Sequence, residues 1–121
     1  MEITKEVLES ILNSYPYQIV FVDCTHTVQW MNTAAKNRYA GRVEIGDCIF
    51  NCHNAASRMK IENFLQRAKD GEDEMFEAYN PQKNEREFFT PVKDKHGNVI
   101  GYFERHEVYW DKDAASTLVR K

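Results

Sequence analysis

The chain has 121 residues, 42% of them hydrophobic, which is enough for one buried core and too little for two domains. Its sixteen basic and nineteen acidic residues give a net charge of −3, and no segment gathers lysine and arginine as a nucleic-acid-binding surface does. The longest apolar run, Ile19 to Val22, is far shorter than the roughly 20 residues that cross a bilayer, so a cytoplasmic protein without nucleic-acid or membrane partners is expected.

An amphipathic helix is predicted near the N-terminus, between Thr4 as an N-cap residue and Pro16 as a helix breaker. Its apolar residues recur at helical spacing and form one stripe: Ile3, Val7, Leu8, Ile11 and Leu12. We expect residues 1–14 to form this helix, residues 15–111 to form the folded domain, and residues 112–121 to be a short tail.

Two strands and a short helix are predicted next. Residues 17–23 are rich in β-branched and aromatic side chains, and residues 25–32 alternate between apolar and polar ones, so the two segments should pair as a hairpin. Asn32 is a favourable N-cap directly after the second strand, and the helix that it begins should end at Gly41.

The rest of the chain predicts one long helix and three strands. After an irregular segment, the helix begins at Asn54 and ends at Gly71. Its buried stripe should consist of Ile61, Phe64, Leu65 and Ala68. Three segments of strand character follow, EMFEAY, REFFTPV and VIGYFERHEVYW, joined by polar turns. This order predicts an α+β fold, in which a five-stranded antiparallel sheet carries its helices on one face.

Two segments carry a family resemblance. Residues 19–39, IVFVDCTHTVQWMNTAAKNRY, resemble the opening of a PAS domain, in which a strand, a turn containing Asp and a second strand lead into a helix that starts with Asn and small residues. Residues 91–104, PVKDKHGNVIGYFE, are similar to the closing PAS hairpin, where a polar turn with Gly97 leads into a strand that holds Gly101.

The resemblance covers residues 8–110 and implies the strand order 2-1-5-4-3. In that order the strand beginning at Gln18 lies beside the strand that contains Phe103. The stretch IGDCIFNCHNAASRMKIENFL is also similar to PAS modules that accompany hemerythrin-like domains in some bacterial proteins, where a Cys-His pair precedes the long helix.

The resemblance implies a sensor module for signal transduction, with a ligand held between the sheet and the helices and no catalysis of its own. Members of the family hold haem, a flavin, a small carboxylate or nothing. Two other functions stay open at this point: a ligand-free dimerisation adaptor, and a small cone-fold enzyme similar to ketosteroid isomerase. The sequence shows no nucleophile elbow and no phosphate-binding glycine loop.

The predicted ligand cavity lies around His53, which directly precedes the long helix. The helix start near Asn54 and an inward-facing Arg105 would favour an anionic group, such as a small carboxylate or a haem propionate. The other residues expected to line the cavity are Tyr39, Cys48 and Cys52. Alternatively, Arg105 reaches solvent over the sheet.

The segment that contains Cys48, Cys52 and His53 can be interpreted in several ways. Covalent haem is not expected, because three residues separate Cys48 from Cys52 and the attachment signature has two. A metal site is not expected either, because a helical segment would point His53 away from the two thiols. The cysteines would then be small buried apolar residues. His53 would bind non-covalent haem, donate a hydrogen bond to a ligand, or only help to start the helix.

The N-terminal helix predicts a homodimer. Its apolar stripe lies before the first strand, where the PAS resemblance implies an extra helix that packs on a second copy or on its own sheet. An unpaired stripe would be an exposed patch of the kind that soluble monomers avoid. The sequence does not identify a signalling partner or an output domain.

Overall fold

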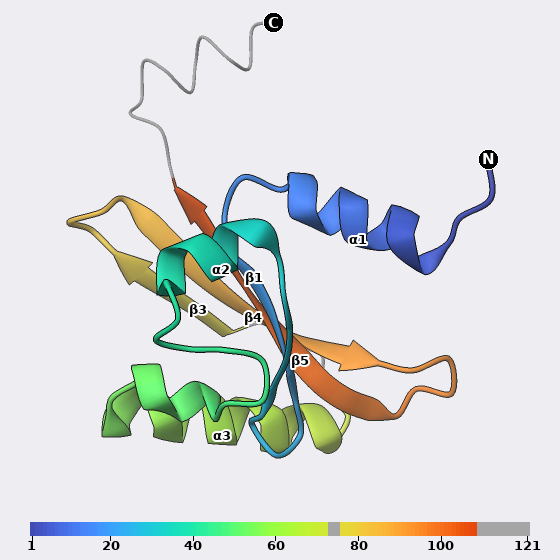
Figure 1. Ribbon diagram of the computed structural model, residues 1–121. Coiled ribbons are helices and arrows are strands. Elements are labelled where there is room, and N and C mark those ends of the chain that lie inside the picture. Colours follow the sequence, from blue (N-terminus) through green and yellow to red (C-terminus); the bar gives the residue numbers. More distant parts are fainter. Residues whose placement is uncertain (73–75, 109–121) are drawn as a thin grey trace, which may run out of the picture.

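The computed structural model describes residues 1–72 and 76–108, which fold into helices packed on a single sheet (Figure 1). The elements in chain order are α1 (Lys5–Ser14), β1 (Ile19–Asp23), β2 (Val28–Met31), α2 (Thr33–Tyr39), the 3-10 helix η1 (Ile49–Cys52), α3 (Ala55–Lys69), β3 (Phe76–Asn80), β4 (Glu85–Lys93) and β5 (Val99–Val108). The strands are antiparallel to their neighbours in the order β2-β1-β5-β4-β3, which confirms the predicted topology.

The first and last strands of the chain meet at the centre of the sheet, as Figure 1 shows for β1 in blue and β5 in orange-red. Phe21 lies opposite Phe103 in this pair, so the predicted adjacency is confirmed. Gly101 lies opposite Asp23, and a Cβ atom at Gly101 would stand 2.2 Å from the Val22 carbonyl oxygen. Only glycine therefore fits at this point of β5.

One face of the sheet, here called the inner face, carries the core. The inward side chains of β1 are Val20 and Val22, and Phe89 of β4 and Tyr102 of β5 lie beside them. Helix α3 covers them with the apolar side chains that its periodicity predicted: Ile61, Phe64, Leu65 and Ala68 are all buried. Ala35 of α2 packs on the same cluster. Alternation along the strands thus turns every second residue toward the helices.

Asn32 is the predicted N-cap of α2, and its role is wider than a cap. Its side-chain Oδ1 accepts from the backbone N–H of Ala35 at 3.0 Å and from that of Ile19 at 2.9 Å. Its Nδ2 donates to the carbonyls of Tyr17 at 2.9 Å and Leu12 at 3.1 Å. The side chain is fully buried, so a single residue joins α1, β1 and α2.

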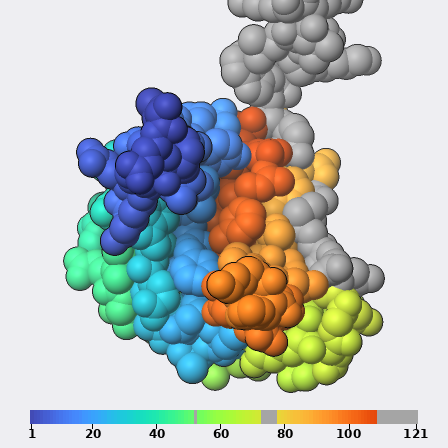
Figure 2. All heavy atoms as spheres, turned by 90° about the vertical axis from the view of Figure 1, so that its right-hand side faces the viewer, coloured from blue at the N-terminus to red at the C-terminus, as the bar shows by residue number. Residues whose placement is uncertain are grey.

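Helix α1 stands apart from this core. Thr4 caps it as predicted, accepting from Val7 at 3.2 Å, and the helix contains no buried residue. Figure 2 shows α1, in dark blue, projecting from the surface of the domain. Its stripe residues Leu8 and Ile11 are 52% and 60% exposed. Among the described residues, no helix is both long enough and apolar enough to span a membrane.

The expectation that Cys48 is a small buried residue is wrong: Cys48 is exposed and pairs in a β-bridge with Thr27. His26, in the turn between β1 and β2, is half-buried. Its ring centroid lies 4.4 Å from that of Phe50, and its Nδ1 lies 2.9 Å from the hydroxyl of Tyr102. Burial lowers the pKa of His26. The side chain of Cys52 lies outside the described part of the structure.

Candidate functional site

A cluster of polar side chains interrupts the apolar inner face near one end of the sheet. On β5, Tyr102 is followed at alternate positions by Glu104 and His106, and all three side chains are buried. Glu85 of β4 and Gln18, just before β1, are buried next to them. Buried ionisable groups need partners, because leaving an unpaired charge away from water is costly.

His106 is the centre of this cluster. Its Nε2 lies 2.8 Å from Glu104 Oε1 and 2.8 Å from Gln18 Nε2, while its Nδ1 contacts the carboxylate of Glu85. The Glu85 carboxylate is also bound by the guanidinium of Arg38, which α2 supplies. The imidazole therefore joins two carboxylates that arrive from neighbouring strands.

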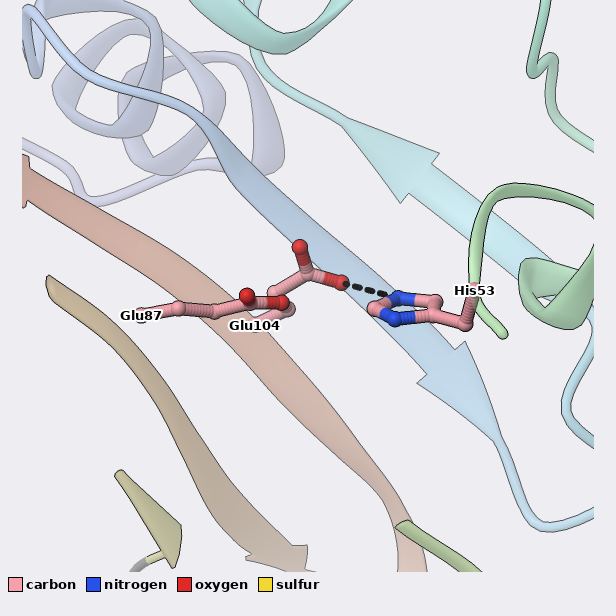
Figure 3. A group of neighbouring side chains, drawn as sticks. All are labelled: His53, Glu87 and Glu104. Carbon is pink, nitrogen blue, oxygen red and sulfur yellow. Dashed lines mark ion pairs between the residues drawn. The ribbon is translucent and has the colours of Figure 1, made fainter. Parts of the chain in front are cut away.

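His53 and Glu87 extend the cluster toward the start of α3 (Figure 3). His53 Nε2 lies 3.9 Å from Glu104 Oε2, and Figure 3 shows the ring pointing at that carboxylate with Glu87 alongside. One ligating atom from each of the three residues can be chosen so that all lie within 4.8 Å of one another. Glu104 Oε2 is buried and receives no hydrogen bond from the described residues.

The neighbouring carboxyl groups of Glu87 and Glu104 differ in charge at neutral pH, because Glu87 is neutral and Glu104 is ionised. Burial and the adjacent Glu104 carboxylate raise the pKa of Glu87 to about 9, so Glu87 is protonated. Burial opposes ionisation of Glu104 as well, but the imidazoles of His106 and His53 outweigh it and hold the pKa of Glu104 well below its usual range. Burial is likewise outweighed at Glu85, where Arg38 and His106 lower the carboxyl pKa.

Two small cavities adjoin the cluster. One of about 140 Å³ is lined by residues that include Arg38, Glu87 and His106. The other, of about 160 Å³, is lined by residues that include Gln18, Arg38 and His106. Drug-sized ligands occupy pockets of about 300–1,000 Å³. These cavities therefore fit an ion or a molecule of a few atoms, and they do not fit haem.

The structure brings together only part of the predicted site. His53 and Tyr39 join the cluster, with the Tyr39 hydroxyl 3.5 Å from Glu104 Oε1 and 3.2 Å from Gln18 Nε2. Asn54, next to His53, caps α3 by accepting from the backbone N–H of Ser57 at 2.8 Å.

The inward orientation expected for Arg105 is wrong. Its guanidinium lies over the ring of Phe88, 4.2 Å from the ring centroid, and pairs with Glu107 on the outer face of the sheet. The prediction took the face of β5 that holds Gly101 as the inner one. The structure turns the other face inward, so Glu104 and His106 occupy the site in place of Arg105.

Sequence reasoning missed the acidic half of the site. Glu85, Glu87 and Glu104 belong to a residue type that is rarely buried, so their identity alone did not indicate an inward position. The one available indication was the alternation of Tyr102, Glu104 and His106, which put an aromatic residue on the same face as the two polar ones.

Comparison with known proteins agrees with the topology. A family model described as PAS domain matches residues 8–105. No curated protein is similar enough in sequence to match. The strand order and this family match are those of a PAS domain and therefore exclude the cone fold that the sequence had left open.

Three similar solved structures have low sequence identity and therefore support the fold alone. A C-terminal domain from Streptococcus mutans has 18% identity and a TM-score of 0.72, covering 95% of this chain and 90% of that chain. The PAS domain of Bordetella pertussis BvgS has 13% identity and a TM-score of 0.64, covering 95% and 93%. The PAS domain of the histidine kinase ThkA has 9% identity and a TM-score of 0.58, covering 75% and 98%. The family match, which covers residues 8–105 and so most of the chain, shows that the chain belongs to the PAS domain family.

Proposed function

We propose that the chain is a sensory PAS module that binds a small ligand in the cluster on its inner face and passes the signal on by protein–protein contact, without catalysis of its own. The observation that carries this proposal is the buried group of carboxyls and imidazoles around Glu104 and His106, beside two cavities. Packing alone does not require ionisable groups at these positions. The similar PAS domain of ThkA is part of a histidine kinase, which supports a signalling role.

The chemistry of the cluster favours a small ligand that carries positive charge or hydrogen-bond donors. Glu104 is ionised, and its Oε2 accepts no hydrogen bond from the described residues. The earlier reason to expect an anion included Arg105, which lies on the opposite face. Arg38 lines both cavities, and its guanidinium is paired with Glu85.

A thermal-shift screen tests this function with a matched pair of variants. We expect small amines or other cationic metabolites to raise the melting temperature of the parent protein and of Glu107→Gln, because Glu107 lies on the outer face beside Arg105. Glu104→Gln should lose the shift, since it removes the inner carboxylate charge. Binding that Glu104→Gln retains in full, or that Glu107→Gln abolishes, would place the site elsewhere.

The proposed protein–protein contact is made by α1, and the proposed partner is a second copy of the chain. The helix exposes the stripe of Ile3, Leu8, Ile11 and Leu12, which are 38% to 61% exposed. Two such stripes laid against each other would remove apolar surface from water in both copies.

Sedimentation equilibrium tests the dimer. The parent chain and the control Lys5→Ser should sediment as dimers, whereas the double variant Leu8→Ser with Ile11→Ser should sediment as a monomer of unchanged circular dichroism. These positions are exposed, so the substitutions leave the core intact. A parent chain that stays monomeric at several hundred micromolar would remove this part of the proposal.

A further inference from the structure

We propose that His53, Glu87 and Glu104 together bind one divalent transition-metal ion, for which Zn²⁺ is the probe. This inference rests on the proposed function and deepens it, because the ion would be the ligand of the inner-face cluster. The three side chains come from separate parts of the chain: the residue before the cap of α3, strand β4 and strand β5. Figure 3 shows them converging on one point.

The spacing of the donor atoms is close to what such an ion needs. One donor from each residue lies within 4.8 Å of the others. Zinc binds imidazole nitrogen and carboxylate oxygen at about 2.0–2.2 Å, so its donors lie roughly 3.3 Å apart in a tetrahedral site. The side chains of His53 and Glu87 are 12% and 22% exposed and so less enclosed than Glu104, which is 1% exposed; a modest rotation would bring their donor atoms closer to it.

An independent observation at Glu104 points to a ligand. Its side chain is 1% exposed, and its Oε2 faces His53 at 3.9 Å without accepting a hydrogen bond from any residue that the structure describes. A buried carboxylate oxygen left in this state costs free energy unless something positive or a donor reaches it. A metal ion between Glu104 and His53 would supply that partner.

The surroundings of Glu104 already form a supporting layer of the kind that metal ligands have. Its Oε1 lies 2.8 Å from His106 Nε2, and His106 is held from its other side by Glu85. Such outer contacts orient a ligating carboxylate and leave its second oxygen for the ion.

The donor set decides the class of ion. One imidazole and two carboxylates suit zinc, manganese or iron, whereas calcium takes six to eight oxygen ligands. Three protein ligands leave a coordination position open, and Glu87 also lines the cavity of about 140 Å³. A small molecule in that cavity would be within reach of the ion.

Calorimetric titration of the metal-free full chain with Zn²⁺ tests the proposal. We expect one ion per chain, with proton release that makes the observed binding enthalpy differ between buffers of different ionisation heat. His53→Ala and Glu87→Gln should each weaken binding at least about 10-fold. Glu87→Gln keeps the shape of the protonated side chain, so its loss of affinity cannot be attributed to unfolding. The controls His96→Ala and Glu107→Gln, which change an exposed turn and the outer face, should bind as the parent does.

The outcomes separate this inference from the proposed function. The metal site is overturned if the parent chain does not bind Zn²⁺. It is also overturned if both His53→Ala and Glu87→Gln bind Zn²⁺ as tightly as the parent, which is the result expected if the ion binds at the exposed Cys48 instead. If Zn²⁺ does not bind while a small cationic metabolite gives the shift that depends on Glu104, the proposed function stands without the metal. If neither binds, both fail.

Discussion

Replacing Asn32 with alanine should lower the free energy of unfolding by about 3 to 5 kcal/mol. The substitution removes four hydrogen bonds at once and takes these partners from two backbone N–H groups and the Tyr17 carbonyl, whereas the Leu12 carbonyl still accepts from the Tyr15 N–H. Each buried polar group left without a partner costs about 1–3 kcal/mol, and water that enters the gap recovers part of this. The sequence alone indicated only the N-cap, whose loss costs about 1 kcal/mol.

Asn54→Ala is the matched control, since Asn54 also caps a helix but is exposed, and within the described part of the chain its side chain bonds only to Ser57. Its loss should cost about 1 kcal/mol. Urea titrations of both variants measure the difference. Equal losses of about 1 kcal/mol would mean that the bonds from Asn32 to α1 and β1 add nothing to stability.

The second large effect is a fall in stability with rising pH that originates at Glu87. Folding raises the pKa of this group from 4.5 to about 9, so between those values the folded chain holds a proton that the unfolded chain has released. The contribution of Glu87 is complete below pH 4.5 and declines by up to about 1.4 kcal/mol per pH unit until its folded pKa is passed. Glu104 and Glu85 have lowered pKa values and act in the opposite sense, since their contributions are lost on acidification.

Denaturant titrations between pH 5 and pH 9 measure this slope. Glu87→Gln mimics the protonated side chain and should show a much flatter profile, while Glu107→Gln should keep the slope of the parent. A parent protein equally stable at both ends of this range would contradict the charge state assigned to Glu87. So would a Glu87→Gln profile as steep as that of the parent.

The fold was largely predictable because local patterns and topology agree. Alternation marked the strands, Asn32 and Asn54 marked the starts of α2 and α3, and the Gly101 hairpin carried the PAS resemblance. The further bonds of Asn32 were not predictable, because Leu12 and Tyr17 reach it only in the folded chain. The boundaries at residues 14 and 111 remain predictions, and the tail of residues 112–121 lies outside the described residues.

Only the site residues that lie at the ends of helices were predictable from the sequence. Tyr39 ends α2 and His53 precedes α3, so both could be placed over the sheet once those helices were recognised. The orientation of β5 could not be placed in this way, because neither face of the strand is purely apolar. It depends on the close approach of β1 to Gly101, a tertiary contact. Which face of β5 turns inward decides whether Arg105 or Glu104 lies in the site.

The proposed ligand site depends on a neutral glutamate, Glu87, beside an ionised one, Glu104, on the inner face of the sheet. Carbon-detected NMR of the side-chain carboxyl groups, followed through a pH titration of the folded protein, measures this directly. We predict that Glu87 titrates near pH 9 and that Glu104 stays ionised well below the ordinary glutamate value of 4.5. Two carboxyl groups that both titrate close to 4.5 would contradict the charge states assigned to Glu87 and Glu104.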